Sequence, residues 1–85
     1  MKGYVSSRDD ISGLDLFRFL AAKGYHICES IGGDIDNVVM SRDCDDFRGY
    51  VGVPVRQPRL ASGYLKHTLD KVGLTLTQLR EFLGD

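Results

Sequence analysis

Apolar residues recur at helical spacing in the N-terminal third of the chain. Ser12 and Asp15 have the spacing of a capping box, in which the serine hydroxyl caps the first turn of a helix. Gly24 follows at a position where helices commonly end in the left-handed conformation. The pattern therefore predicts a helix over residues 12–23. Its predicted apolar stripe consists of Ile11, Leu14, Phe17, Leu20 and Ala21.

Two further helices are predicted near the C-terminus. Ser62 is a suitable N-cap for the first of them, and Gly73 a suitable end. Thr75 and Gln78 form a second capping box, which opens a short final helix. The predicted apolar faces are Leu65, Leu69 and Val72 in one helix, and Leu76, Leu79, Phe82 and Leu83 in the other.

The middle of the chain has the composition of strands. Segments 37–41 and 49–55 are short and rich in valine, and an acidic turn at 42–46 separates them. Segment 25–31 is mixed in composition but includes Ile27 and Ile31 and lies between a helix end and a glycine pair. In segment 49–55 the valines alternate with Tyr50, Gly52 and Pro54, which fits a half-buried strand near an edge. The order αβββαα predicts an α+β fold, with a three-stranded antiparallel sheet and helices packed on one face.

The length of 85 residues allows one small domain, which we assign to residues 11–85 after a loose polar segment, 1–10. No apolar run approaches the roughly 18 residues of a transmembrane helix. The first ten residues contain no apolar core of a signal peptide, so we expect a cytoplasmic location and no membrane partner.

The cysteine and acidic positions do not predict a metal site. Cys28 and Cys44 stand sixteen positions apart without a CxxC motif, and in a chain of this kind we expect two reduced thiols rather than a disulfide. Neither histidine has zinc-ligand spacing to a cysteine. The sequence from Asp34 to Asn37 lacks the glycine and distal glutamate of a calcium-binding EF-hand loop. We therefore expect no metal and no other cofactor.

The net charge of −1 excludes a polycation that binds nucleic acid by bulk charge. The charge is unevenly distributed, however: residues 48–85 carry six basic and three acidic side chains, and no acidic residue occurs from 48 to 67. This segment is interpreted either as an ordinary solvated surface or as a phosphate-binding face at a helix start. The candidate residues for contacting the phosphates of a nucleic acid such as RNA are Arg56, Arg59, Ser62, Lys66 and His67.

The segment from Val53 to Leu74 resembles the C-terminal block of the HicA (YcfA-like) toxins. In that family a strand containing Val-Pro precedes a loop and a helix with the pattern GTL…IL…AGL. Here Gly63-Tyr64-Leu65, Thr68-Leu69 and Val72-Gly73-Leu74 occupy those places. In the N-terminal half, a helix ending at Lys23-Gly24-Tyr25 and a strand leading to Gly32-Gly33 follow the family order. The resemblance covers roughly residues 12–83.

The resemblance implies a fold like that of double-stranded-RNA-binding domains and an mRNA endoribonuclease silenced by a HicB-type antitoxin protein. The family's catalytic histidine follows the glycine pair, where a side chain titrating near neutrality suits a general base for the ribose 2′-hydroxyl. This chain has Asp34 at that position. Three interpretations stay open: a replacement base, a toxin that has lost its chemistry, or a simple turn residue.

Three functional hypotheses follow. In the first, the chain is a HicA-like toxin component of a type II toxin–antitoxin system that binds RNA, with its nuclease activity lost or altered. In the second, the same fold is a non-catalytic protein-interaction module. In the third, it is a ribonuclease with a changed catalytic set that uses Asp34 or His67.

Overall fold

The computed structural model describes residues 10–29 and 36–84. Asp34 and most of the predicted loose segment 1–10 lie outside these ranges. The described elements, in chain order, are α1 (Gly13–Ala22), β1 (His26–Ile27), β2 (Val38–Ser41), the short 3-10 helix η3 (Phe47–Gly49), β3 (Val51–Val53), α2 (Ser62–Val72) and α3 (Leu76–Phe82).

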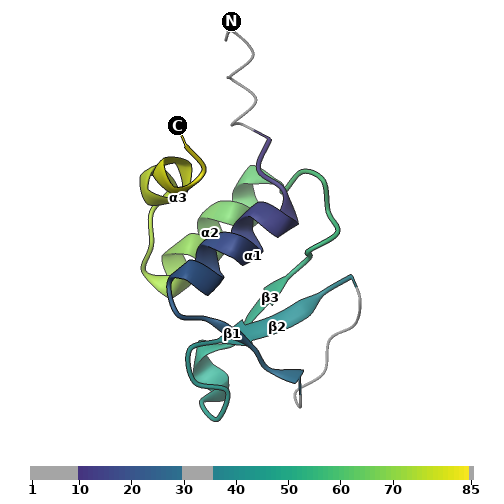
Figure 1. The fold of residues 1–85 in the computed structure, drawn as a ribbon, viewed down its shortest axis with the longest axis vertical. Helices are drawn as coiled ribbons and strands as arrows, with labels where there is room; N and C mark the ends of the chain where they lie inside the picture. The colour runs from purple at the N-terminus through teal and green to yellow at the C-terminus, as the bar shows by residue number, and fades with distance from the viewer. Residues whose placement is uncertain (1–9, 30–35, 85) are drawn as a thin grey trace, which may run out of the picture.

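The architecture is α+β, as the sequence predicts. The strands form one open antiparallel sheet in the order β1-β2-β3, with Met40 paired to Ile27 on one side and to Val51 on the other. Figure 1 shows the three helices gathered on one side of this sheet. Both flanking strands are short, and Pro54, which has no amide hydrogen to donate, directly follows β3.

The core lies between the helices and the inner face of the sheet. Val51 and Val53 are buried while Gly52 between them is exposed, which confirms the alternation predicted for this strand. The buried apolar residues that meet them come from all three helices. They include Leu16, Phe19 and Leu20 of α1, Leu65 and Leu69 of α2, and Leu79 of α3.

The two capping boxes and the two predicted end glycines mark helix ends correctly. The Ser12 hydroxyl accepts a hydrogen bond from the Asp15 amide at 3.0 Å, and the Asp15 carboxylate accepts one from the Ser12 amide at 3.1 Å. Thr75 and Gln78 form the same reciprocal pair at the start of α3. Gly24 and Gly73 have the positive φ angles, +94° and +75°, expected of residues that end helices.

The predicted buried face of the first helix is wrong in part. Leu14 and Ala21 are exposed, whereas Leu16 and Phe19 are fully buried. Since most positions of this helix are apolar, the spacing does not select one face. The face is selected by tertiary packing, in which the Phe19 and Phe82 rings lie 5.5 Å apart.

The prediction of two reduced thiols is also wrong, because Cys28 and Cys44 form a disulfide. The amide of Cys28 donates to the Val39 carbonyl at 2.8 Å, so this cysteine continues the pairing of β1 with β2. The chain turns back after β2 and brings Cys44 to within 5.4 Å of Cys28 between Cα atoms. The separation of the two cysteines by sixteen positions does not predict that the chain turns back in this way.

Candidate functional site

The predicted cationic site lies on the connection between β3 and α2, residues 54–61. Two backbone hydrogen bonds, each 2.8 Å long, tie this connection to the start of α1: Leu60 N–H donates to the Ile11 carbonyl, and Gly13 N–H donates to the Gln57 carbonyl. A Cβ atom at position 13 would lie 1.8 Å from the Pro54 carbonyl oxygen. The close approach therefore requires glycine at position 13, a role that the sequence pattern alone does not reveal.

The arginines on this connection are exposed but form ion pairs. Arg59 Nε lies 2.9 Å from a carboxylate oxygen of Asp10, and Arg56 Nε lies 3.6 Å from one of Asp36. All four side chains are roughly half exposed or more, between 49% and 71%. Exposed pairs of this kind contribute about 0–1 kcal/mol, so an approaching phosphate can replace the aspartate at little cost.

Lys66 and Ser62 belong to the first turns of α2. Lys66 Nζ lies 3.1 Å from a carboxylate oxygen of Asp70, one helical turn further on. The predicted role of Ser62 as N-cap is wrong: the cap residue is Ala61, and Ser62 is the first residue of the helix. Because Ala61 has no side-chain acceptor, the N-cap residue does not cap the amides of the first turn of α2, and the positive end of the helix can attract an anion.

The two histidines lie on different elements of the fold. His67 is exposed on α2, as the sequence predicts, and His26 is exposed in β1. The position assigned to catalysis, Asp34, lies outside the described residues. Within the described ranges, no three histidine, cysteine, aspartate or glutamate side chains gather as metal ligands.

A polar hollow of about 290 Å³ adjoins the cationic connection. It is lined by Asp36, Asn37, Pro54, Arg56 and Gln57. The sequence singles out only Arg56 among them as a candidate binding residue. Asn37 and Gln57 are missed because a lone amide side chain carries no motif, although both offer donors and acceptors to a ribose or a base edge.

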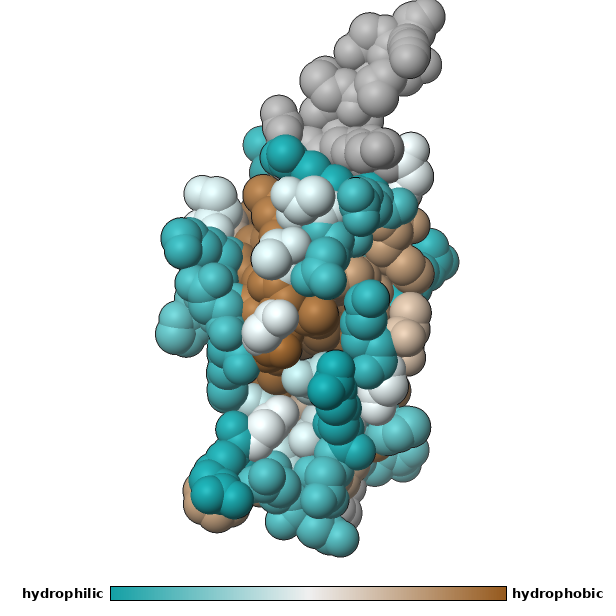
Figure 2. All heavy atoms as spheres, turned by 90° about the vertical axis from the view of Figure 1, so that its left-hand side faces the viewer, coloured by the Kyte–Doolittle hydropathy of each residue, from teal (hydrophilic) through white to brown (hydrophobic). Residues whose placement is uncertain are grey.

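An apolar groove lies along α2 and the start of α3. Leu65, Leu69, Leu74 and Leu76 line it together with Ser62, Lys66, Asp70 and Thr75. Figure 2 shows an apolar stripe on this side of the molecule, bordered by hydrophilic side chains. Two of the predicted RNA-binding residues, Ser62 and Lys66, therefore border an apolar surface as well as the cationic connection.

Tyr64 joins α2 to β3, because its phenol donates a hydrogen bond to the Gly52 carbonyl. Burial raises the pKa of Tyr64 above its usual 10.0, and a hydrogen bond with Thr68 lowers it in part. The neutral phenol is thus favoured in the folded state. The stabilisation that comes from the neutral phenol of Tyr64 is present below pH 10.0 and is lost as the pH rises through the raised pKa.

Replacing Tyr64 with phenylalanine is expected to remove this dependence. The variant should lose about 1 kcal/mol at neutral pH, because the bond to Gly52 is gone. Above pH 10.0 the difference in free energy of unfolding between the two proteins should narrow, since only the wild type has a half-buried phenol to ionise at position 64. Urea denaturation over this pH range measures both effects, and a constant gap would contradict the assignment.

In the two described ranges, no helix is long and apolar enough to cross a membrane. No family model, no curated protein and no solved structure matches the chain. The functional argument therefore rests on the geometry of the connection between β3 and α2.

Proposed function

We propose that the chain is a HicA-like component of a type II toxin–antitoxin system that binds RNA in the cytoplasm and is bound by a HicB-like antitoxin protein. The element order and the antiparallel sheet are those that the resemblance of residues 12–83 implies. Fold likeness alone does not assign an activity, so the proposal depends on the chemistry of the cationic connection.

One observation carries the proposal: Arg56 and Arg59 are exposed on a connection that leads directly into a helix without a side-chain cap. Guanidinium groups and free helix amides are the donors that phosphate oxygens accept. Lys66 adds a third cation one turn into the helix. Such a set contacts the backbone of RNA largely without regard to its sequence.

The chemistry of cleavage is proposed to be lost or altered. A carboxylate with the ordinary aspartate pKa of about 3.9 is a much weaker base at neutral pH than the histidine that the family has at position 34. RNA cleavage by the wild type should therefore be undetectable or slow, and Asp34→His should increase it. If the wild type cleaves and His67→Ala abolishes the cleavage, the third hypothesis, a changed catalytic set, replaces this one.

RNA binding itself is tested by fluorescence anisotropy with a labelled RNA hairpin at several salt concentrations. Arg56→Glu and Arg59→Glu should each weaken binding about tenfold and make the logarithmic salt slope shallower by about one unit. Arg18→Glu is the matched control, because Arg18 is exposed on α1 outside the cationic connection. Equal losses for all three variants would indicate only a bulk charge effect.

A second candidate function, a protein-interaction module without RNA, is favoured by the ion pairs. Asp10 and Asp36 neutralise the two arginines and lower the positive charge of the surface. If the wild type binds no RNA at low salt, this function replaces the first. Because a reducing cytoplasm opposes disulfides, binding should be compared with the Cys28–Cys44 bond formed and reduced.

A further inference from the structure

The connection between β2 and β3 exposes a large aromatic side chain. Phe47 is 73% exposed, whereas the other exposed large hydrophobic residues among those described range from 38% to 44%. It belongs to η3, near the tip of a loop that comprises residues 42–49 and that we call the β2–β3 loop. Figure 1 places this loop at the end of the molecule away from the helices. Phe47 therefore contributes little to the core.

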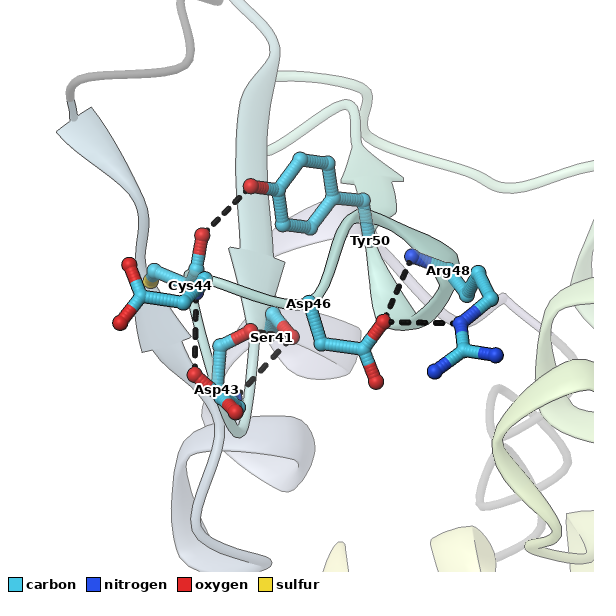
Figure 3. A network of polar contacts seen from close by, with 7 residues as sticks. Ser41, Asp43, Cys44, Asp46, Arg48 and Tyr50 are labelled. Atoms are coloured by element: carbon cyan, nitrogen blue, oxygen red, sulfur yellow. Dashed lines mark hydrogen bonds and ion pairs between the residues drawn. The ribbon is translucent and has the colours of Figure 1, made fainter.

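The β2–β3 loop is held by a disulfide and by hydrogen bonds, and Figure 3 shows the hydrogen bonds of Ser41, Asp46 and Tyr50 from close by. At its start, the disulfide joins Cys44 to Cys28, which is 2% exposed and continues β1. The Ser41 hydroxyl accepts from the Asp43 amide at 3.1 Å and donates to the Asp43 carbonyl at 3.0 Å. At its end, the Tyr50 phenol donates to the Cys44 carbonyl.

The residues beside Phe47 are also fixed. One carboxylate oxygen of Asp46 accepts from both the amide and the Nε of Arg48, each at 3.1 Å. The Asp43 carboxylate accepts from the Asp45 amide at 3.0 Å. A side chain presented by a preorganised loop loses little conformational entropy on binding, and buried aromatic side chains dominate the affinity of many protein interfaces. Phe47 is presented by such a loop, and a partner that covers it would bury its exposed ring.

The charge around Phe47 indicates the kind of partner. Asp43 and Asp45 are exposed and Asp46 is half-buried, while Arg48 is already paired with Asp46. These carboxylates repel the phosphates of RNA and attract lysine and arginine side chains. The loop carries three aspartates against two arginines, Arg42 and Arg48, so it is acidic on balance. An aromatic side chain on an acidic loop is complementary to a segment whose apolar residues are flanked by cations.

We propose that the β2–β3 loop is a preorganised protein-docking surface, with Phe47 as its anchor, and that it binds a cationic amphipathic segment of another protein. This surface is distinct from the cationic connection, where the expected ligand is an anion. The proposal does not depend on RNA binding, so the two can fail separately.

The test is a selection from a displayed library of random peptides on the oxidised wild type, with excess Phe47→Ala protein in solution as competitor. Enriched peptides should combine apolar residues with lysine or arginine. In fluorescence anisotropy, each synthesised peptide should bind Phe47→Ala about tenfold more weakly than the wild type, or worse. Since Phe47 is exposed, this variant should keep the wild-type midpoint of thermal unfolding.

Two further variants sharpen the result. Leu14→Ala is the matched control, because Leu14 is an exposed apolar residue of α1, and its affinity should equal that of the wild type. Cys28→Ala combined with Cys44→Ser should weaken peptide binding several-fold, because the covalent bond that holds the start of the loop to β1 is removed. A selection that yields no peptide dependent on Phe47, or yields acidic ones, overturns the proposal, as does binding of RNA or of a second copy of the chain through Phe47.

Discussion

Gly13→Ala is expected to lower the free energy of unfolding by about 3 kcal/mol, and the midpoint of thermal unfolding by about 15 °C. The added methyl group would lie 1.8 Å from the Pro54 carbonyl oxygen and 2.6 Å from its carbon. Both are backbone atoms, so they cannot rotate away as the end of a side chain would. Either α1 or the connection after β3 must move, and the bond from Gly13 N–H to the Gln57 carbonyl must lengthen or break.

Gly63→Ala is the matched control for this substitution. Gly63 is also in the first turn of a helix, but no atom lies within 4 Å of the position its Cβ would take. Alanine should therefore be neutral there, or stabilise the protein by up to about 1 kcal/mol through its better helix propensity. Differential scanning calorimetry of the two variants measures the contrast. Similar midpoints would show that the contact at Gly13 is looser than described.

Removing the disulfide is expected to have an effect of similar size. The combined variant Cys28→Ala and Cys44→Ser should lose about 3 kcal/mol, because the bond closes a loop of sixteen residues and restricts the unfolded chain. Alanine is used at position 28 because that side chain is buried and serine would place a hydroxyl in the core. Urea denaturation gives the free energy of unfolding.

The reducing agent provides an internal control for the disulfide. Adding a thiol reductant should shift the wild-type urea midpoint toward that of the combined variant and leave the variant unchanged. If the reductant shifts neither protein, the bond does not form in solution, and the preorganisation of the β2–β3 loop would then rest on the hydrogen bonds of Ser41 and Tyr50 alone.

Features set by neighbours in the sequence could be predicted. Each capping box depends on two residues three positions apart, and each glycine at a helix end depends on its own φ angle, so no tertiary information is needed. The alternation of buried and exposed residues in β3 is likewise local. These signals were enough to order the elements and to assign the α+β class.

Features set by distant parts of the chain could not be predicted. The pattern places Arg56 and Arg59 on one connection, but their partners Asp36 and Asp10 approach from segments twenty and forty-nine positions away. The disulfide depends on the turn after β2, and the buried face of α1 depends on packing against α3. Each of these contacts depends on how the folded chain brings distant segments together. The spacing of apolar residues in the sequence does not specify that arrangement.

The two edge strands of the sheet limit how copies of the protein can associate. β1 contributes two residues, and β3 contributes three before Pro54, so each border offers few backbone groups to an incoming strand. Edge-to-edge growth, the route by which folded β proteins recruit one another into fibrils, thus has little template on the described borders. On these described borders, association of the native protein is therefore expected to proceed through side chains rather than through strand addition.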